Sequence, residues 1–132
     1  MTPIHRPIPN WRPSTQPIMS GAFEQLLHEH SGIAIHFWAS WNGCDPVLDQ
    51  SIQAIASEFT GRLSFYSCDV DREENVGLAR RCRVANIPFL AVFVRGKERR
   101  PIIGTRSASE LKNELEARLE EADLRKKWWR FW

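Results

Sequence analysis

Two short apolar segments constrain the fold of this chain more than any other feature. IAIHFWA occupies positions 33–39 and FLAVFV occupies positions 89–94, and both segments are rich in β-branched and aromatic residues. Apolar runs of this length and composition are typical of buried strands. Buried strands must be covered by other elements, and a sheet that contains them therefore needs helices packed against it.

The segments between these strands supply the helices. DPVLDQSIQAIASEF, at positions 45–59, repeats its apolar residues at helical spacing and predicts an amphipathic helix. The resulting order, αβαβαββα, predicts an α/β fold in which parallel strands and a terminal hairpin form one mixed sheet between helices on both faces. The remaining expected elements are helices at 21–30, 75–81 and 108–127 and strands at 63–71 and 98–104.

Composition narrows the functional classes. The 132 residues are enough for one domain with a single sizeable core, and the net charge of +2 favours neither nucleic acid nor an acidic substrate. The three cysteines form no CxxC pair and no metal-ligand spacing, so we expect no metal or cofactor and a reducing compartment. The N-terminal 17 residues lack the apolar core of a signal peptide, which predicts a cytoplasmic protein.

Several motifs occur in an order that is similar to one known family. The sequence contains FWASW at 37–41, CDVD at 68–71 and ANIPF at 85–89. Over residues 20–119 these motifs and their spacing resemble the thioredoxin family, whose active-site segment reads FWA-x-W-C-G-P-C. The resemblance implies a thioredoxin-like fold with N- and C-terminal extensions, and it implies a cis peptide bond before Pro88.

The same resemblance exposes departures at the positions that carry the family's chemistry. Asn42 and Asp45 stand where the two active-site cysteines are expected, and Cys44 stands in place of the proline between them. Neither replacement can act as the attacking or resolving thiol, so dithiol chemistry is not expected. The degenerate active-site positions are His36, which replaces a buried acid, together with Trp41, Asn42, Gly43, Cys44, Asp45 and Pro88.

Cys44 leaves two interpretations open. As a thiol near a helix start it could serve a monothiol oxidoreductase or a redox sensor, with Pro88 as the cis-proline position. Against this, Asp45 and Asp49 place negative charge nearby, which disfavours a thiolate. Asp45 followed by Pro46 also suits a helix N-cap and first turn, which favours a structural loop and a passive Cys44.

The other polar candidates in the predicted core are interpreted as structural. Cys68 and Cys82 are expected to be buried small apolar residues rather than resolving thiols. His36 lies in a predicted core strand, and the other three histidines fall in different segments, so a metal site is not expected.

Both ends of the chain have unusual composition. Residues 1–17 hold five of the eight prolines, which predicts an extended arm. The C-terminal RKKWWRFW interleaves cations with three of the six tryptophans, a composition typical of a contact surface. A protein groove, an anionic membrane surface or the domain itself could receive this tail, and nucleic acid is the least expected target. The expected partner-binding residues are Trp11, Arg12, Arg125, Lys126, Lys127, Trp128, Trp129, Arg130, Phe131 and Trp132.

The sequence therefore predicts three parts: an arm at 1–19, a thioredoxin-like domain at 20–122 and a basic, aromatic tail at 123–132. The favoured function is a redox-inactive scaffold, linker or accessory subunit, held by its two ends in a larger protein assembly that is cytoplasmic or peripheral to a membrane. The alternative is a monothiol oxidoreductase or redox sensor that uses Cys44.

Overall fold

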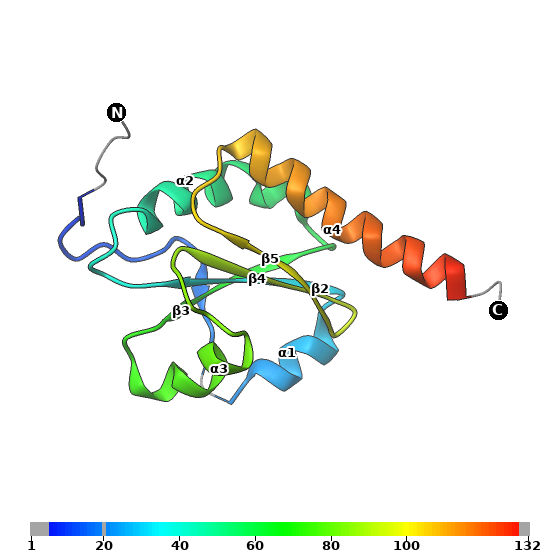
Figure 1. Cartoon of the computed structure of the whole chain (residues 1–132), viewed down its shortest axis with the longest axis horizontal. Coiled ribbons are helices and arrows are strands. Elements are labelled where there is room, and N and C mark those ends of the chain that lie inside the picture. The colour runs from blue at the N-terminus through cyan, green and yellow to red at the C-terminus, as the bar shows by residue number, and fades with distance from the viewer. Residues whose placement is uncertain (1–5, 20, 130–132) are drawn as a thin grey trace.

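A five-stranded mixed sheet forms the centre of the computed structural model, which describes residues 6–19 and 21–129, with side chains as far as residue 124 (Figure 1). The strand order is β1-β3-β2-β4-β5, in which β1, β3 and β2 run parallel and β4 and β5 are antiparallel to their neighbours. The strands are β1 (Gln16–Pro17), β2 (Gly32–Trp38), β3 (Ser64–Asp69), β4 (Phe89–Val94) and β5 (Lys97–Ile103).

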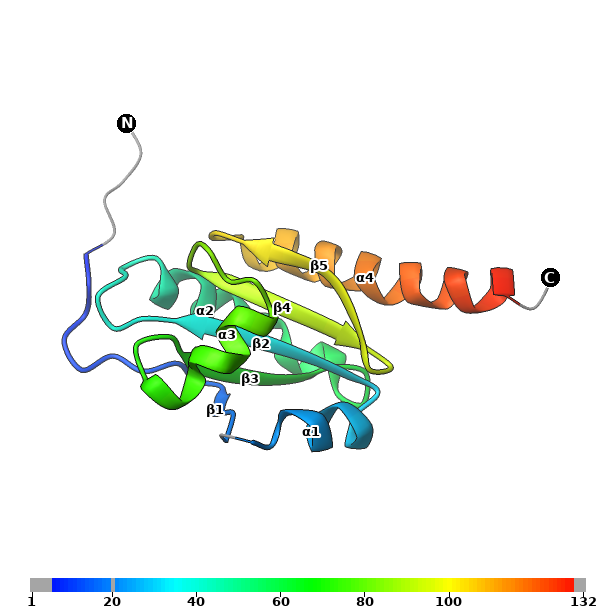
Figure 2. The same cartoon turned by 60° about the horizontal axis from the view of Figure 1, so that its bottom comes forward.

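Helices cover the sheet on both sides, as the sequence predicted. Figures 1 and 2 show α2 and α4 on one face and α1 and α3 on the other. Short 3₁₀ turns follow α2 and precede α3. The helices are α1 (Phe23–Glu29), α2 (Asp45–Ile55), α3 (Val76–Arg81) and α4 (Ala108–Trp129).

The core has two layers, and β2 contributes to both. Successive residues of a strand point to opposite faces. Ala34 therefore packs with α2 and α4, in a layer that includes Leu48, Ile52, Leu111 and Leu115. The second layer, between the sheet and the helices α1 and α3, includes Phe23, Ile33, Ile35, Phe37, Cys68, Cys82 and Phe93. By the same alternation, His36 lies on the side of α2.

One strand was not predicted. Gln16 and Pro17 of β1 pair with Tyr66 and Ser67 of β3, and the N–H of Ile18 donates to the carbonyl of Ser67 at 2.8 Å. The surrounding prolines hide this strand in the sequence, because proline lacks the N–H that a central strand needs. An edge strand has a neighbour on one side only, so a proline whose nitrogen faces the open side costs no hydrogen bond of the sheet.

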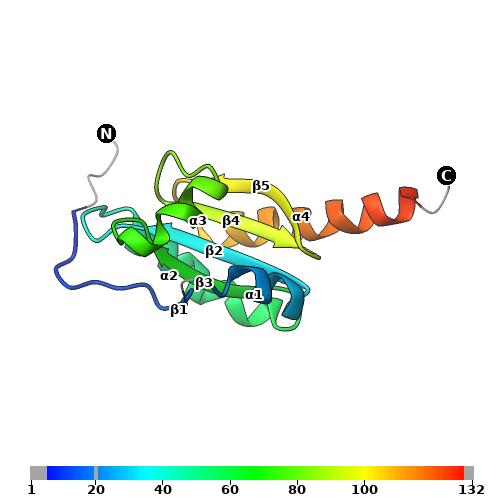
Figure 3. The same cartoon turned by 90° about the horizontal axis from the view of Figure 1, so that it is seen from below.

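The described part of the N-terminal arm is fastened to its own domain. Ser14 donates from its backbone N–H and its hydroxyl to the Asp49 carboxylate, at 3.1 and 3.0 Å. Asp49 is only 2% exposed, and Gln53 also donates to it. Trp11 packs edge-on against Trp38, with ring centroids 5.5 Å apart. Figure 3 shows the arm (blue) running beside the domain to β1.

The two predicted contact residues of the arm differ in their exposure. Trp11 is half-buried against its own domain, whereas Arg12 remains exposed. Residues 11–18 are thus part of the folded unit, with a strand at residues 16–17. A role of Arg12 in binding a partner stays a prediction.

Helix α4 begins with a capping box and extends beyond the body of the domain. The Ser107 hydroxyl accepts from the N–H of Glu110, and the Glu110 carboxylate accepts from the N–H of Ser107. The helix continues through residue 122 to Trp129, so the backbone of residues 125–129 is helical. Residues 130–132 lie outside the described residues, and the predicted contacts of the tail stay predictions. Within the described chain, no helix is both long and apolar enough to cross a membrane.

The arm contact leads to a stability prediction. We expect Ser14→Ala to lower the free energy of unfolding by about 1–2 kcal/mol, because Asp49 loses a hydrogen bond in a buried setting. Urea denaturation measures the change. Ser40→Ala is the matched control, since Ser40 is exposed and makes no side-chain hydrogen bond among the described residues. Equal, negligible effects of the two substitutions would contradict the fastening of the arm.

Candidate functional site

The predicted site residues do come together at one end of the sheet. Trp41 to Cys44 form the loop between β2 and α2. Phe89 of β4 pairs with Phe37 of β2, so Pro88 lies beside the point where this loop leaves the sheet. The Ile87–Pro88 peptide bond is cis, as the sequence resemblance predicted.

Asp45 is a buried partner of His36. Its Oδ1 lies 2.8 Å from His36 Nε2, and its Oδ2 accepts from the N–H of Ala39 at 3.1 Å. Both the aspartate and the histidine are 0% exposed. The predicted N-cap role of Asp45 is wrong: α2 begins at Asp45, Cys44 is the N-cap residue, and no side chain caps the helix.

The surroundings of this pair indicate which side chain donates the hydrogen bond. Asp45 accepts at both oxygens and lies in the first turn of α2, where the helix dipole favours negative charge. Nε2 of His36 is then the donor. Nδ1 of His36 is buried and has no partner within the described residues, which suits a lone pair better than an N–H that lacks an acceptor. The pair therefore joins α2 to β2 by one buried hydrogen bond.

Local contacts of Asn42 and Trp41 order the rest of the loop. The Oδ1 of Asn42 accepts from the N–H of Cys44 at 3.2 Å, a turn typical of asparagine. The indole of Trp41 is 61% exposed and donates to the Asp71 carboxylate at 2.9 Å.

The three cysteines are free thiols in different settings. Cys44 is partly exposed, whereas Cys68 and Cys82 are buried between the sheet and the helices α1 and α3. Burial raises the pKa of the Cys68 thiol to about 12 and that of the Cys82 thiol to about 11. Thiols with such pKa values carry almost no thiolate at neutral pH. The exposed fraction of 2% for each side chain confirms the prediction that both cysteines are buried.

An open groove borders the loop, and sequence reasoning missed it. It has a volume of about 610 Å³ and runs from Trp41 along α3 to Ile87. Val76, an apolar residue of the short helix α3, is 38% exposed beside it. The apolar residues of α3 are the part of the sequence that could have pointed to the groove. Its lining residues are Trp41, Val70, Val76, Ala79, Arg80, Arg83, Val84, Ala85 and Ile87.

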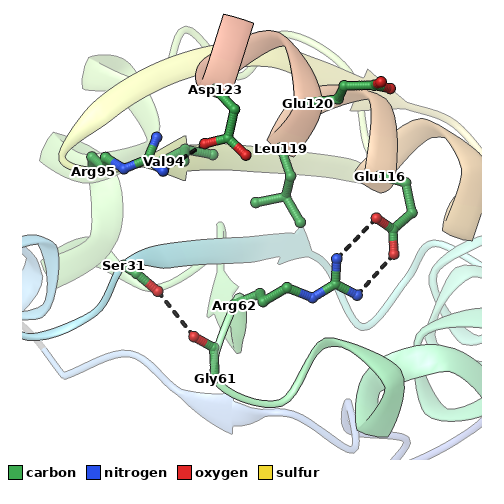
Figure 4. Close-up of a pocket in the computed structure, with 9 residues that line it drawn as sticks. All are labelled: Ser31, Gly61, Arg62, Val94, Arg95, Glu116, Leu119, Glu120 and Asp123. Carbon is green, nitrogen blue, oxygen red and sulfur yellow. Dashed lines mark hydrogen bonds and ion pairs between the residues drawn. The ribbon is translucent and has the colours of Figure 1, made fainter. Parts of the chain in front are cut away.

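A second hollow lies at the opposite end of the sheet, under α4, and has a volume of about 530 Å³ (Figure 4). Both arginines that line it pair with carboxylates of α4. Arg62 donates to both carboxylate oxygens of Glu116, at 2.9 and 2.8 Å, and Arg95 contacts Asp123 at 2.6 Å. A charged ligand would have to displace these pairs, so we assign no binding function to this hollow.

His30 and His36 each make hydrogen bonds to side chains of their own domain. His30 contacts the Ser64 hydroxyl at 3.1 Å and the Tyr66 hydroxyl at 3.0 Å, and His36 contacts Asp45. Across the residues that the structure describes, no group of three His, Cys, Asp or Glu side chains is placed to hold a metal ion.

The buried pair leads to a second prediction. We expect Asp45→Ala to lower the free energy of unfolding by about 3–5 kcal/mol, because it leaves Nε2 of His36 and a backbone N–H buried without an acceptor. Asp71→Ala is the matched control, because it removes an exposed carboxylate that also accepts one hydrogen bond, and it should cost less than about 1 kcal/mol.

Chemical denaturation of the two variants measures their free energies of unfolding. If Asp45→Ala fails to fold, Asp45→Asn gives a second measurement, since asparagine keeps an acceptor oxygen for one of the two donors. Equal costs for Asp45→Ala and Asp71→Ala would show that the buried pair is not a structural contact.

Comparison with known proteins agrees with this geometry. Thioredoxin M2 from Arabidopsis thaliana chloroplasts is 26% identical over 102 residues, which are 76% of this chain and 54% of that protein. Thioredoxin 1 of Chlorobaculum tepidum is 38% identical over 65 residues, 49% of this chain and 62% of that protein. The chain spans about half the length of the first curated relatives that it matches.

Solved structures give the same fold. Mitochondrial thioredoxin 3 of Saccharomyces cerevisiae superposes with a TM-score of 0.70 at 22% identity, over 79% of this chain and 95% of that one. A thioredoxin of Malassezia sympodialis superposes with a TM-score of 0.69 at 24% identity, over 82% of this chain and 93% of that one. The family model described as thioredoxin matches residues 14–117, and this chain therefore belongs to the thioredoxin family.

Proposed function

We propose that this chain is a redox-inactive thioredoxin-like domain that serves as a scaffold, linker or accessory subunit of a larger protein assembly. The observation that carries the proposal is the buried contact between His36 and Asp45. By the family resemblance, Asp45 occupies the place of the resolving cysteine, and His36 the place of the acid that assists proton transfer.

The physical argument concerns what this pair can and cannot do. Thiol–disulfide exchange requires a thiolate to attack and a second thiol to resolve the mixed disulfide. Asn42 and Asp45 supply neither thiol, and the only cysteine of the loop is Cys44. Asp45 instead accepts from His36 and from the N–H of Ala39, so its side chain holds the loop in place.

A scaffold needs a stable body and surfaces that remain available. The exposed Trp41 and the groove beside it offer one such surface. Helix α4 offers a second, because it extends past the domain and leads into the aromatic and basic C-terminal residues (Figure 1). Partners would therefore bind at the groove, at the C-terminal end of α4 and at Arg12. The assembly itself would be cytoplasmic.

A monothiol oxidoreductase or redox sensor is the second candidate. Two observations favour it: Cys44 is partly exposed, and it is the N-cap residue of an 11-residue helix. A thiol at a helix N-terminus benefits from the helix dipole when it ionises. The same loop lacks a resolving cysteine, so this chemistry would need an external thiol such as glutathione to complete a cycle.

Insulin reduction with dithiothreitol as the electron source tests the proposal. We expect the native protein and Cys44→Ser to leave the rate at the uncatalysed value. We expect a variant that carries His36→Asp, Asn42→Cys, Cys44→Pro and Asp45→Cys to accelerate reduction. This variant has the two cysteines, the intervening proline and the buried acid of the family's active site at the matching positions of the same fold.

The outcomes separate the two candidates. Catalysis by the native protein that Cys44→Ser abolishes would overturn the redox-inactive proposal and favour the monothiol enzyme. If the fourfold variant does not fold, the double variant with Asn42→Cys and Asp45→Cys keeps the comparison, since it restores both thiols with fewer changes.

A further inference from the structure

Helix α4 leaves the body of the domain at its C-terminal end. Among the residues whose burial the structure describes, Ala122 is the last buried residue of α4, and Leu124 is 51% exposed. The helical backbone nevertheless continues to Trp129. Figures 1, 2 and 3 show these last turns beyond the edge of the sheet. The final residues of the chain therefore follow a helix that points away from the core.

The charge of the chain changes sign where α4 leaves the domain. Four carboxylates of α4 each contact an arginine of the domain. The pairs are Glu114 with Arg106, Glu116 with Arg62, Glu121 with Arg100 and Asp123 with Arg95. Residues 125–132, the basic segment, instead contain four cations and no acid. Because the net charge of the whole chain is +2, the rest of the chain carries a net charge of −2.

The basic segment also holds four aromatic residues, and their spacing suits a helix. On a helix of 3.6 residues per turn, positions 128, 129 and 132 fall on one side and positions 126, 127 and 130 on the opposite side. The first three positions are tryptophans and the other three are cations. Arg125 alone departs from this division, and it stands first, nearest the domain. The sequence therefore predicts that a helix continued through the segment is aromatic on one side and cationic on the other.

Such a two-sided segment matches the surface of a lipid bilayer. Tryptophan is favoured at the boundary between headgroups and acyl chains, and lysine and arginine are attracted by anionic headgroups. Amphipathic helices with this division lie in the plane of the interface. A protein groove would have to supply an apolar pocket on one side and a matching set of carboxylates on the other, whereas an anionic bilayer presents both along its whole surface.

We propose that the basic segment and the last turn of α4 bind the surface of an anionic lipid bilayer. The tryptophans enter the boundary below the headgroups, the cations contact the headgroup phosphates, and α4 holds the negatively charged remainder of the chain away from the surface. The contact is peripheral, because eight residues are too few to span the hydrocarbon core. This inference rests on the proposed function, since it specifies what the C-terminal end of α4 contacts in a domain that docks elsewhere.

Co-sedimentation of the 132-residue chain with lipid vesicles tests the proposal. One set of vesicles is phosphatidylcholine alone, and the other also contains about 30% phosphatidylglycerol, which is anionic. We expect binding to the anionic vesicles to be about tenfold or more tighter than binding to the neutral ones. Because salt screens the attraction between cations and headgroups, we expect the difference to shrink at about 0.5 M salt.

Lys127→Gln with Arg130→Gln is the decisive variant. Each cation near an anionic surface contributes about fivefold to binding, so we expect this pair of substitutions to weaken binding to the anionic vesicles about tenfold or more. Arg72→Gln with Lys112→Gln is the matched control, because it also removes one lysine and one arginine and gives the same net charge. Both control residues lie on the domain, and each contacts an exposed glutamate. We expect the control to weaken binding less than about twofold.

Trp128→Ala with Trp129→Ala separates a bilayer contact from packing of the segment on its own domain. We expect this variant to weaken binding to the anionic vesicles about tenfold or more, because two aromatic residues no longer enter the interface. We expect its Tm to change by less than about 2 °C, because burial along the described part of α4 ends at Ala122. A fall in Tm of about 4 °C or more would show that the segment packs on the domain, and would overturn the inference.

Other results would also overturn the inference. These are equal binding to neutral and anionic vesicles, no binding to either, or equal weakening by the two pairs of charge substitutions. Tighter binding of an oligodeoxythymidine single strand than of anionic vesicles would do the same. Such failures, with a native protein inactive toward insulin, would leave the proposed function standing, whereas insulin reduction by the native protein would overturn that function separately.

Discussion

The contact between His36 and Asp45 fixes the end of the sheet where the family places its chemistry. It joins the first residue of α2 to the middle of β2, and the same carboxylate holds the N–H of Ala39 at the start of the loop. Because both side chains are fully buried, neither can change without leaving a polar group unpaired. The loop that follows is thereby held by a structural contact in which no thiol takes part.

A second buried acid extends this arrangement to the N-terminal arm. Asp49 lies one turn after Asp45 in α2 and accepts from Ser14 and Gln53. The arm therefore closes over α2 and then adds β1 to the sheet. Two carboxylates of α2 thus find partners in other elements. Asp45 contacts His36 in a core strand, and Asp49 accepts from Ser14 in a segment that the composition alone marks as a proline-rich extension.

Sequence reasoning succeeded where the determinants are local and failed where distant segments meet. The apolar runs of β2 and β4 and the amphipathic pattern of α2 carry the signals of their own structure, and the family resemblance gave the fold and the cis bond before Pro88. Asp45 was misread because a local preference for the N-cap competes with a partner in β2 that only the fold brings near. The groove was missed for the same reason, since its lining comes from Trp41 and from residues 70–87.

The central proposal is that this member of the thioredoxin family keeps the fold without a dithiol redox couple. The most direct measurement is an NMR redox titration against dithiothreitol and glutathione buffers from about −350 to −150 mV, a range that includes the potential of about −270 mV of thioredoxin. The signals of the Trp41 indole and the His36 ring report on the loop. We predict that they stay unchanged across the range, whereas a two-electron transition with formation of a disulfide within the chain would contradict the account.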